Sequence, residues 1–172
     1  MRKILFLLFC FPMLVAGQFT LIPDSAFEQA LINLNLDDVF DDSVYTSAID
    51  TVAIMYLSNN VIADLTGIKD SIQLSWLFCS GNQIVHLDLS NNSNLVELNC
   101  NDNFLSSLDV RNGNNTGLWY FTAVNNSDLQ CIAVNDIAYS NNHWLKDSGC
   151  VFSSNCGIVN RLYALSLNTY FS

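Results

Sequence analysis

The sequence is poor in charged residues, and poorest in basic ones. Only 13% of its 172 residues are charged and 51% are hydrophobic, a balance that excludes a disordered, solvated chain. Six Lys and Arg residues oppose 16 Asp and Glu residues, for a formal net charge of −10. Because such a chain repels nucleic-acid phosphates, the composition argues against nucleic acid as a partner. We expect one domain with a real hydrophobic interior.

The N-terminal apolar run is too short to span a membrane. Residues 4–15 fall below the roughly 20 residues that a spanning helix needs. They follow Arg2 and Lys3 and precede Ala16 and Gly17, the pattern of a secretory signal peptide cleaved near Gly17. We expect a mature chain that begins at Gln18, carries four basic and 16 acidic residues and has no membrane span. It is then secreted or displayed at the cell surface, where disulfides are stable.

Common catalytic and metal-binding motifs are also missing. The sequence contains no G-x-S-x-G, H-E-x-x-H or C-x-x-C, and its only histidines are His86 and His143. The acidic residues within 37–42 lack the D-x-[DN]-x-[DN]-G pattern and the trailing Glu of a calcium loop, so a solvated loop is favoured over a weak calcium site. We predict a non-enzyme with no catalytic residue, metal site or cofactor.

What the sequence does contain is a repeat of 21 residues. The apolar, Cys and Asn positions of residues 74–89 recur, from Leu95 against Leu74, in residues 95–110. Their pattern is L-x-x-L-x-C-x-x-N-x-L. It also fits residues 52–65 and, after a two-residue insertion, residues 118–126, so four turns can be counted. This period and spacing are typical of leucine-rich repeats, whose units must stack to bury their apolar sides.

The repeat predicts which side chains face inward. In a short strand alternate side chains point to opposite faces, so Leu77 and Cys79 point inward while Trp76 and Phe78 point outward. Cys79 and Cys100, one turn apart, are expected to act as small apolar fillers rather than as metal or redox groups. The asparagine that follows each strand is expected to bind the backbone of the bend and to form a hydrogen-bonded ladder of Asn60, Asn82, Asn103 and Asn126.

Units such as "LVELNCNDNFLSSLDV" resemble the short-period leucine-rich-repeat proteins exported by bacteria. The stretches "IPDSAFEQALINLNLDD" and "LQCIAVNDIAYSNNHWLKDSGCVFSSNCG" resemble the N- and C-terminal caps of that family. The resemblance implies a solenoid with a short parallel β-ladder, irregular return segments, a helical N-terminal cap and a C-terminal cap closed by a disulfide. The residues alone leave Cys150 either unpaired or as the partner of Cys131, whereas the resemblance implies the pair Cys131 and Cys156.

We expect five segments along the chain. They are a signal peptide (1–17), an N-terminal cap (18–51), about four repeat turns (52–128), a C-terminal cap (129–157) and a tail (158–172). Within the N-terminal cap, Asp24 is expected to be the N-cap residue of a helix whose apolar residues are spaced by three and four positions.

The resemblance implies a module that binds an extracellular protein or peptide, or a glycan, through its strand face. Exposed Tyr and Trp dominate binding energies when a partner desolvates them, so outward strand residues are the candidate contacts. The predicted binding residues are Tyr56, Trp76, Phe78, Glu97, Asn99 and Tyr120. Aromatic residues that only stack on one another across turns are the alternative. The alternative function is a structural spacer, or a truncated fragment of a larger cell-surface adhesin, without binding activity of its own.

Overall fold

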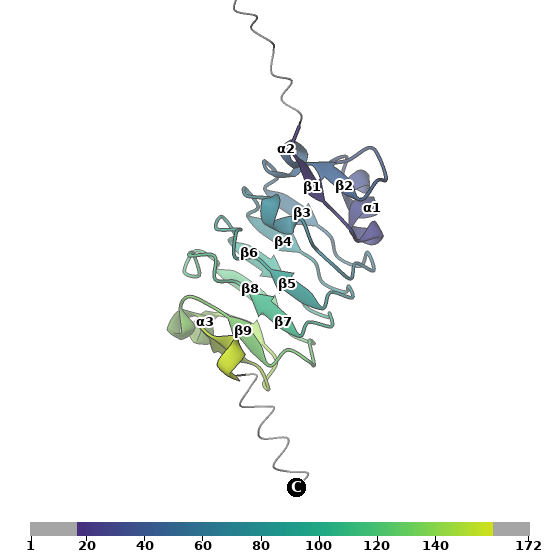
Figure 1. Cartoon of the computed structure of the whole chain (residues 1–172). Helices are drawn as coiled ribbons and strands as arrows, with labels where there is room; N and C mark the ends of the chain where they lie inside the picture. Colours follow the sequence, from purple (N-terminus) through teal and green to yellow (C-terminus); the bar gives the residue numbers. More distant parts are fainter. Residues whose placement is uncertain (1–16, 160–172) are drawn as a thin grey trace, which may run out of the picture.

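A computed structural model describes residues 17–159, which form a parallel β-solenoid of about five turns (Figure 1). The predicted signal peptide, apart from Gly17, and residues 160–172 of the predicted tail lie outside the described residues. Each turn adds one strand to a five-stranded parallel sheet, called here the strand-face sheet, in the order β10-β8-β6-β4-β3. Its strands are β3 (Ile54–Tyr56), β4 (Trp76–Phe78), β6 (Glu97–Asn99), β8 (Tyr120–Ala123) and β10 (Leu145–Lys146).

The return segments are more regular than the sequence pattern predicts. Four of the turns add a second short strand, and these strands pair in parallel in the order β11-β9-β7-β5, which we call the return sheet. Its strands are β5 (His86–Asp88), β7 (Ser107–Asp109), β9 (Cys131–Ala133) and β11 (Val151–Ser153). In the first turn a 3₁₀ helix, η1 (Ile68–Asp70), occupies the return side instead. The solenoid therefore has hydrogen-bonded sheets on two sides.

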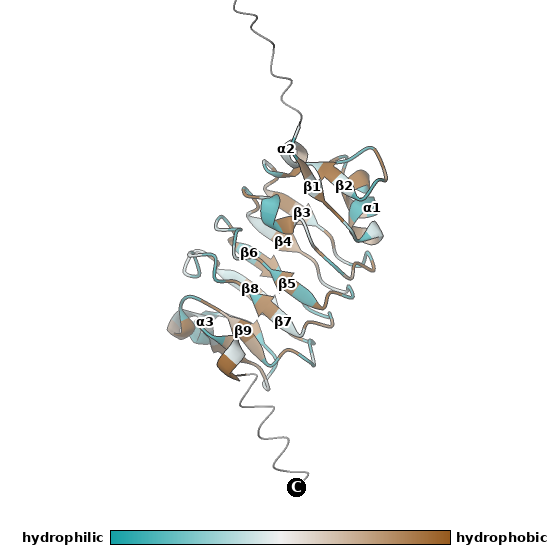
Figure 2. Ribbon diagram, viewed as in Figure 1, coloured by the Kyte–Doolittle hydropathy of each residue, from teal (hydrophilic) through white to brown (hydrophobic). Residues whose placement is uncertain are grey.

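The core lies between the two sheets and runs the length of the solenoid. Each turn contributes the same inward positions, so the buried residues form columns, such as Met55, Leu77, Leu98 and Phe121 in the strand-face sheet. Leu87, Leu108 and Ile132 form the matching column of the return sheet. In Figure 2 the strands carry much of the apolar colouring and the bends are mostly hydrophilic. Burial of these columns is the main stabilising term, because no turn covers its own apolar side.

The N-terminal cap covers the first turn as predicted. It consists of β1 (Phe19–Leu21), α1 (Ser25–Asn33), β2 (Ser43–Tyr45) and α2 (Thr46–Ile49), with β1 and β2 antiparallel. One carboxylate oxygen of Asp24 caps α1 by accepting from the backbone N–H groups of Ala26 and Phe27. The other accepts from Ala63 and Asp64 of the first turn, at 2.8 and 2.9 Å. The helix cap and the solenoid are thus tied by the same side chain.

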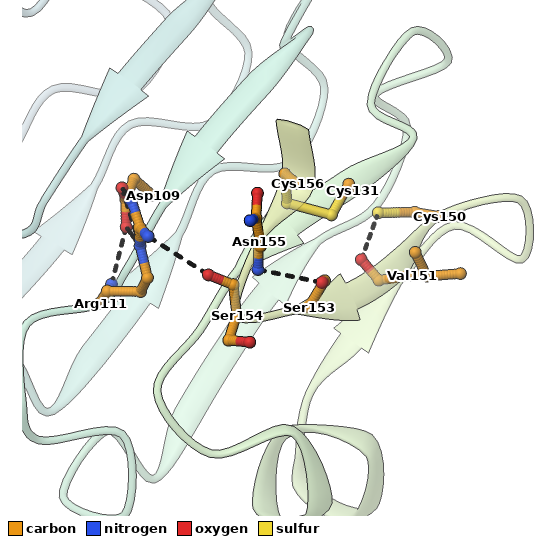
Figure 3. The surroundings of a disulfide bond; sticks show 9 residues. All are labelled: Asp109, Arg111, Cys131, Cys150, Val151, Ser153, Ser154, Asn155 and Cys156. Carbon is orange, nitrogen blue, oxygen red and sulfur yellow. Dashed lines mark hydrogen bonds and ion pairs between the residues drawn. A yellow bond between two sulfur atoms is a disulfide. The ribbon is translucent and has the colours of Figure 1, made fainter. Parts of the chain in front are cut away.

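The C-terminal cap continues both sheets instead of only closing them. After α3 (Ile137–His143), β10 pairs with β8 and β11 pairs with β9. Trp144 is buried, and its ring stacks on that of Phe121 with the centroids 4.5 Å apart. Its indole N–H donates to the Leu118 carbonyl oxygen. The predicted disulfide is confirmed: Cys131 and Cys156 are bonded, while Cys150 is a free, buried thiol beside them (Figure 3).

Candidate functional site

The outward side chains of the strand-face sheet form two columns. The pairing of the strands places Ile54, Trp76, Glu97 and Tyr120 in one column. The second column consists of Tyr56, Phe78, Asn99, Thr122 and Leu145. All six predicted binding residues therefore lie on one face, which we call the strand face. With five strands about 4.8 Å apart, the ladder is about 19 Å across.

Three aromatic residues form a cluster at the N-terminal end of the strand face. The rings of Tyr56 and Phe78 are stacked, with centroids 5.2 Å apart and planes 6° from parallel. Trp76 meets Phe78 edge-on at 6.4 Å. Their mutual contact does not bury them, because Tyr56 is 61% exposed and Trp76 is 37% exposed. The rings of this cluster therefore contact one another and also remain accessible to a partner.

A second apolar cluster lies at the C-terminal end of the strand face. Tyr120 is 39% exposed and meets Trp119 edge-on at 6.1 Å. Trp119 and Leu145 are both more than 60% exposed, yet the repeat pattern does not predict either as a contact. Trp119 could have been noticed in the sequence as part of the aromatic run "LWYF". Leu145 lies on the strand face only because the C-terminal cap adds β10 to the sheet.

The middle of the strand face is polar. The amide oxygen of Asn99 accepts from the backbone N–H of Asn101, and that of Asn101 accepts from the Thr122 hydroxyl and the Val124 N–H. Thr122 itself is buried. Glu97 is half-buried, and no hydrogen bond or ion pair joins its carboxylate to another residue within 17–159. A polar strip with one unpaired negative charge therefore separates the two apolar clusters.

Asparagine side chains fix the bends that follow these strands. The amide of Asn103 donates to the carbonyl oxygens of Cys79 and Cys100 and accepts from the N–H of Ile84. Asn82 and Asn126 make the equivalent bonds one turn before and one turn after. Asn60, in the first turn, is only half-buried and its amide donates to Ser58 of its own turn. Each buried asparagine thus links its own turn to the preceding one.

Two thiols are stacked inside the solenoid behind the strand face. Cys79 and Cys100 follow β4 and β6 at matching positions, and both are fully buried. Burial raises the pKa of Cys79 to about 12. Burial, together with the neighbouring Cys79 thiol, raises the pKa of Cys100 as well. Both thiols therefore remain protonated at neutral pH and fill space in the core as small apolar groups.

The return sheet carries a separate cavity of about 300 Å³, lined by polar and apolar residues. It lies between the outward side chains of β5 and β7 and the segment around Cys156. His86 Nδ1 lies 2.9 Å from Ser107 Oγ, while Arg111 binds Asp109 and donates to the Ser154 carbonyl oxygen (Figure 3). Burial would raise the pKa of Asp109, but its hydrogen bonds and ion pair with Arg111 lower that pKa overall.

The two histidines of residues 17–159 have no carboxylate as a hydrogen-bond partner. His86 Nδ1 lies beside the Ser106 and Ser107 hydroxyls, and His143 Nδ1 lies 2.8 Å from the Tyr139 carbonyl oxygen. The described part of the chain also has no group of three or more His, Cys, Asp or Glu side chains arranged to hold a metal ion. None of its helices is long and apolar enough to cross a membrane.

Comparison with known proteins gives structural neighbours only. No family model and no curated protein matches the chain. The functional domain of InlJ from Listeria monocytogenes is 25% identical over 80% of this chain, with a TM-score of 0.52. The chain has a leucine-rich-repeat fold similar to that of this bacterial protein. The match covers only 28% of the length of the InlJ chain.

Two further solved structures are similar to parts of it. A structure of CBM51-2 with GlcNAc and INT domains of Clostridium perfringens ZmpB is 23% identical over 56% of this chain and 21% of that chain, with a TM-score of 0.46. An internalin, InlF, of Listeria monocytogenes is 18% identical over 73% of this chain and 56% of that chain, with a TM-score of 0.41. The InlJ domain includes a cysteine ladder, and this leucine-rich-repeat protein has Cys79 and Cys100 at matching positions of consecutive turns.

Proposed function

We propose that this leucine-rich-repeat protein is an exported, non-enzymatic module that binds a peptide or an extended protein loop through its strand face. The observation that carries the proposal is the exposure of the two aromatic clusters, around Trp76 and around Tyr120, on one rigid sheet. Tyr and Trp present large contact areas with few rotatable bonds, so they give much binding energy for little lost entropy.

The size of the strand face favours a peptide over a folded partner. Three-residue strands are about 10 Å long, so the ladder has an area of roughly 200 Å². A standard protein interface buries about 800 Å² on each partner. An extended segment of six residues is about 20 Å long and matches the ladder from β3 to β10.

Two features support export of the chain. Arg2 and Lys3 before the apolar residues 4–15 form the pattern of a signal peptide. The Cys131–Cys156 disulfide is stable in an oxidising compartment, such as the outside of the cell, and uncommon in the cytosol. We therefore propose that the module is secreted or held at the cell surface.

Panning a random peptide library on the immobilised chain tests the proposed function. We expect the wild-type chain to enrich a family of peptides that the variant Trp76→Ala fails to retain. Trp76 is partly exposed and outside the core, so this variant should keep the wild-type melting temperature. His86→Ala, on the return sheet, is the matched control and should retain the peptides.

Two results would count against binding by the strand face. Failure to enrich any peptide would favour the spacer function, unless a glycan array gives binding that depends on Trp76. Enrichment that survives in Trp76→Ala but is lost in His86→Ala would move the site to the return sheet.

A further inference from the structure

The column through β4, β6 and β8 contains an unusual juxtaposition of one carboxylate and two aromatic rings. Trp76, Glu97 and Tyr120 are direct neighbours in register on three successive strands. Their Cα atoms are about 4.8 Å apart from strand to strand, so the two aromatic residues stand about 10 Å apart with Glu97 between them. Trp76 and Tyr120 are 37% and 39% exposed, which leaves the rings accessible on both sides of the carboxylate.

No cation of the described chain neutralises Glu97. Residues 17–159 contain three Lys or Arg residues, and none is paired with Glu97. Arg111 is paired with Asp109, the Lys146 ammonium donates to the Cys150 carbonyl oxygen, and Lys69 lies in η1 beside a cavity of the return side. Glu97 is therefore a half-buried charge with no partner inside the part of the chain that the structure describes.

We infer that Glu97, flanked by Trp76 and Tyr120, is the specificity site for an arginine side chain in the bound peptide. The inference rests on the proposed function, since it concerns the same face. A guanidinium group offers paired N–H donors that match a carboxylate, and its flat faces stack on aromatic rings. A lysine ammonium is a compact point charge without a flat face, so it uses the rings less well. The apolar clusters on either side select apolar residues before and after the arginine.

The charge of the whole molecule agrees with a basic ligand. The formal net charge is −10, so the surrounding field attracts a cationic peptide and repels an acidic one. The association rate of a basic peptide should therefore fall as ionic strength rises.

The test uses three synthetic peptides that differ at one central position. Each is an extended pentapeptide with blocked ends, Leu-Thr-X-Thr-Leu, where X is arginine, citrulline or lysine. Citrulline keeps the size and planarity of arginine but carries no charge. NMR titration of the full chain, which follows the indole N–H of Trp76 and the backbone N–H of Glu97, gives the dissociation constants.

We expect the arginine peptide to bind about tenfold more tightly than the citrulline peptide, with the lysine peptide between them. The variant Glu97→Gln preserves the shape of the side chain and should reduce the arginine preference to less than about twofold. Asp88→Asn removes the same charge from the return sheet and should leave the preference unchanged.

Several outcomes overturn the inference. It is wrong if arginine and citrulline peptides bind equally, if the arginine peptide does not bind, or if Glu97→Gln retains the preference. Equal binding of all three peptides that is lost in Trp76→Ala would overturn the arginine site and leave the proposed function standing. Loss of the arginine preference in Asp88→Asn would show a general effect of net charge instead of a site at Glu97.

Discussion

Asp147 Oδ2 accepts a hydrogen bond of 2.7 Å from the backbone N–H of Asn126. Its other oxygen accepts from the N–H of Asn125. In the first turn the acceptor at this place is the amide oxygen of Asn82, one turn further along, which accepts from the N–H of Asn60. Asp147 therefore ends the asparagine ladder. A carboxylate suits this last position because both of its oxygens accept from backbone N–H groups.

Replacement of Asn103 by Leu should destabilise the solenoid by about 2–4 kcal/mol. The substitution leaves the N–H of Ile84 without a partner in a buried bend. It also removes one of the two amide bonds to each of the carbonyl oxygens of Cys79 and Cys100, which keep those from Asn82 and Asn126. Denaturant unfolding of the two proteins measures the difference. Asn94→Leu, at an exposed bend, is the control and should cost less than about 1 kcal/mol. Equal stability of Asn103→Leu and the wild type would contradict a structural ladder.

Loss of the disulfide should lower the free energy of unfolding by about 2–4 kcal/mol. The bond joins residues 25 apart, so it limits the freedom of the unfolded chain, and it fixes the end of the C-terminal cap. The double variant Cys131→Ala/Cys156→Ala prevents Cys150 from replacing a lost partner. Reduction of the wild type with dithiothreitol should give a similar loss in thermal denaturation. Cys150→Ala keeps the bond and should respond to the reductant as the wild type does.

The three free thiols within residues 17–159 should resist alkylation in the folded chain. Burial raises the pKa of Cys79 to about 12 and that of Cys150 to about 11, and it raises the pKa of Cys100 too. At pH 8 the reactive thiolate of Cys79 is therefore on the order of one part in 10⁴. Iodoacetamide treatment followed by peptide mass spectrometry should show labelling at these positions only after denaturation. Rapid labelling of Cys100 in the folded chain would contradict its burial.

The ion pair between Asp109 and Arg111 should give a small, pH-dependent stabilisation. Because the folded-state pKa of Asp109 is lowered from 3.8, its contribution is present well above that value and is lost as the pH falls below it. Arg111→Gln should raise the pKa of Asp109 in a carboxyl NMR titration. Since Arg111 is largely exposed, the stability difference at pH 7 should stay below about 1 kcal/mol. An unchanged Asp109 pKa would show that the pair does not form.

The 21-residue spacing is enough to predict the solenoid, because equivalent positions must stack wherever the apolar pattern repeats. Leu77, Leu98 and Phe121 accordingly occupy one buried column. The return segments alternate apolar and polar residues, which is enough to place Leu87 and Leu108 in the core. Strands as short as His86–Asp88 do not show in the sequence that they pair into a second sheet.

The ends of the strand face are predicted least well. Trp119 lies just before a strand, where alternation does not define its direction, and Leu145 belongs to a cap outside the repeat. Trp144 lies in a polar stretch of sequence but is buried against Phe121, because the cap must fill the open end of the core. These positions depend on how the last turn packs, which the repeat pattern does not contain.

An NMR footprint shows whether the strand face recognises an extended peptide. A peptide enriched on the wild-type chain is titrated into the isotope-labelled protein, and backbone shifts are followed in both sheets. Recognition by the strand face should give the largest changes in β4, β6 and β8, with shifts of the Trp76 and Trp119 indole N–H signals. Changes concentrated at His86, Ser107 and Asp109 of the return sheet, with the strand face unmoved, would contradict it.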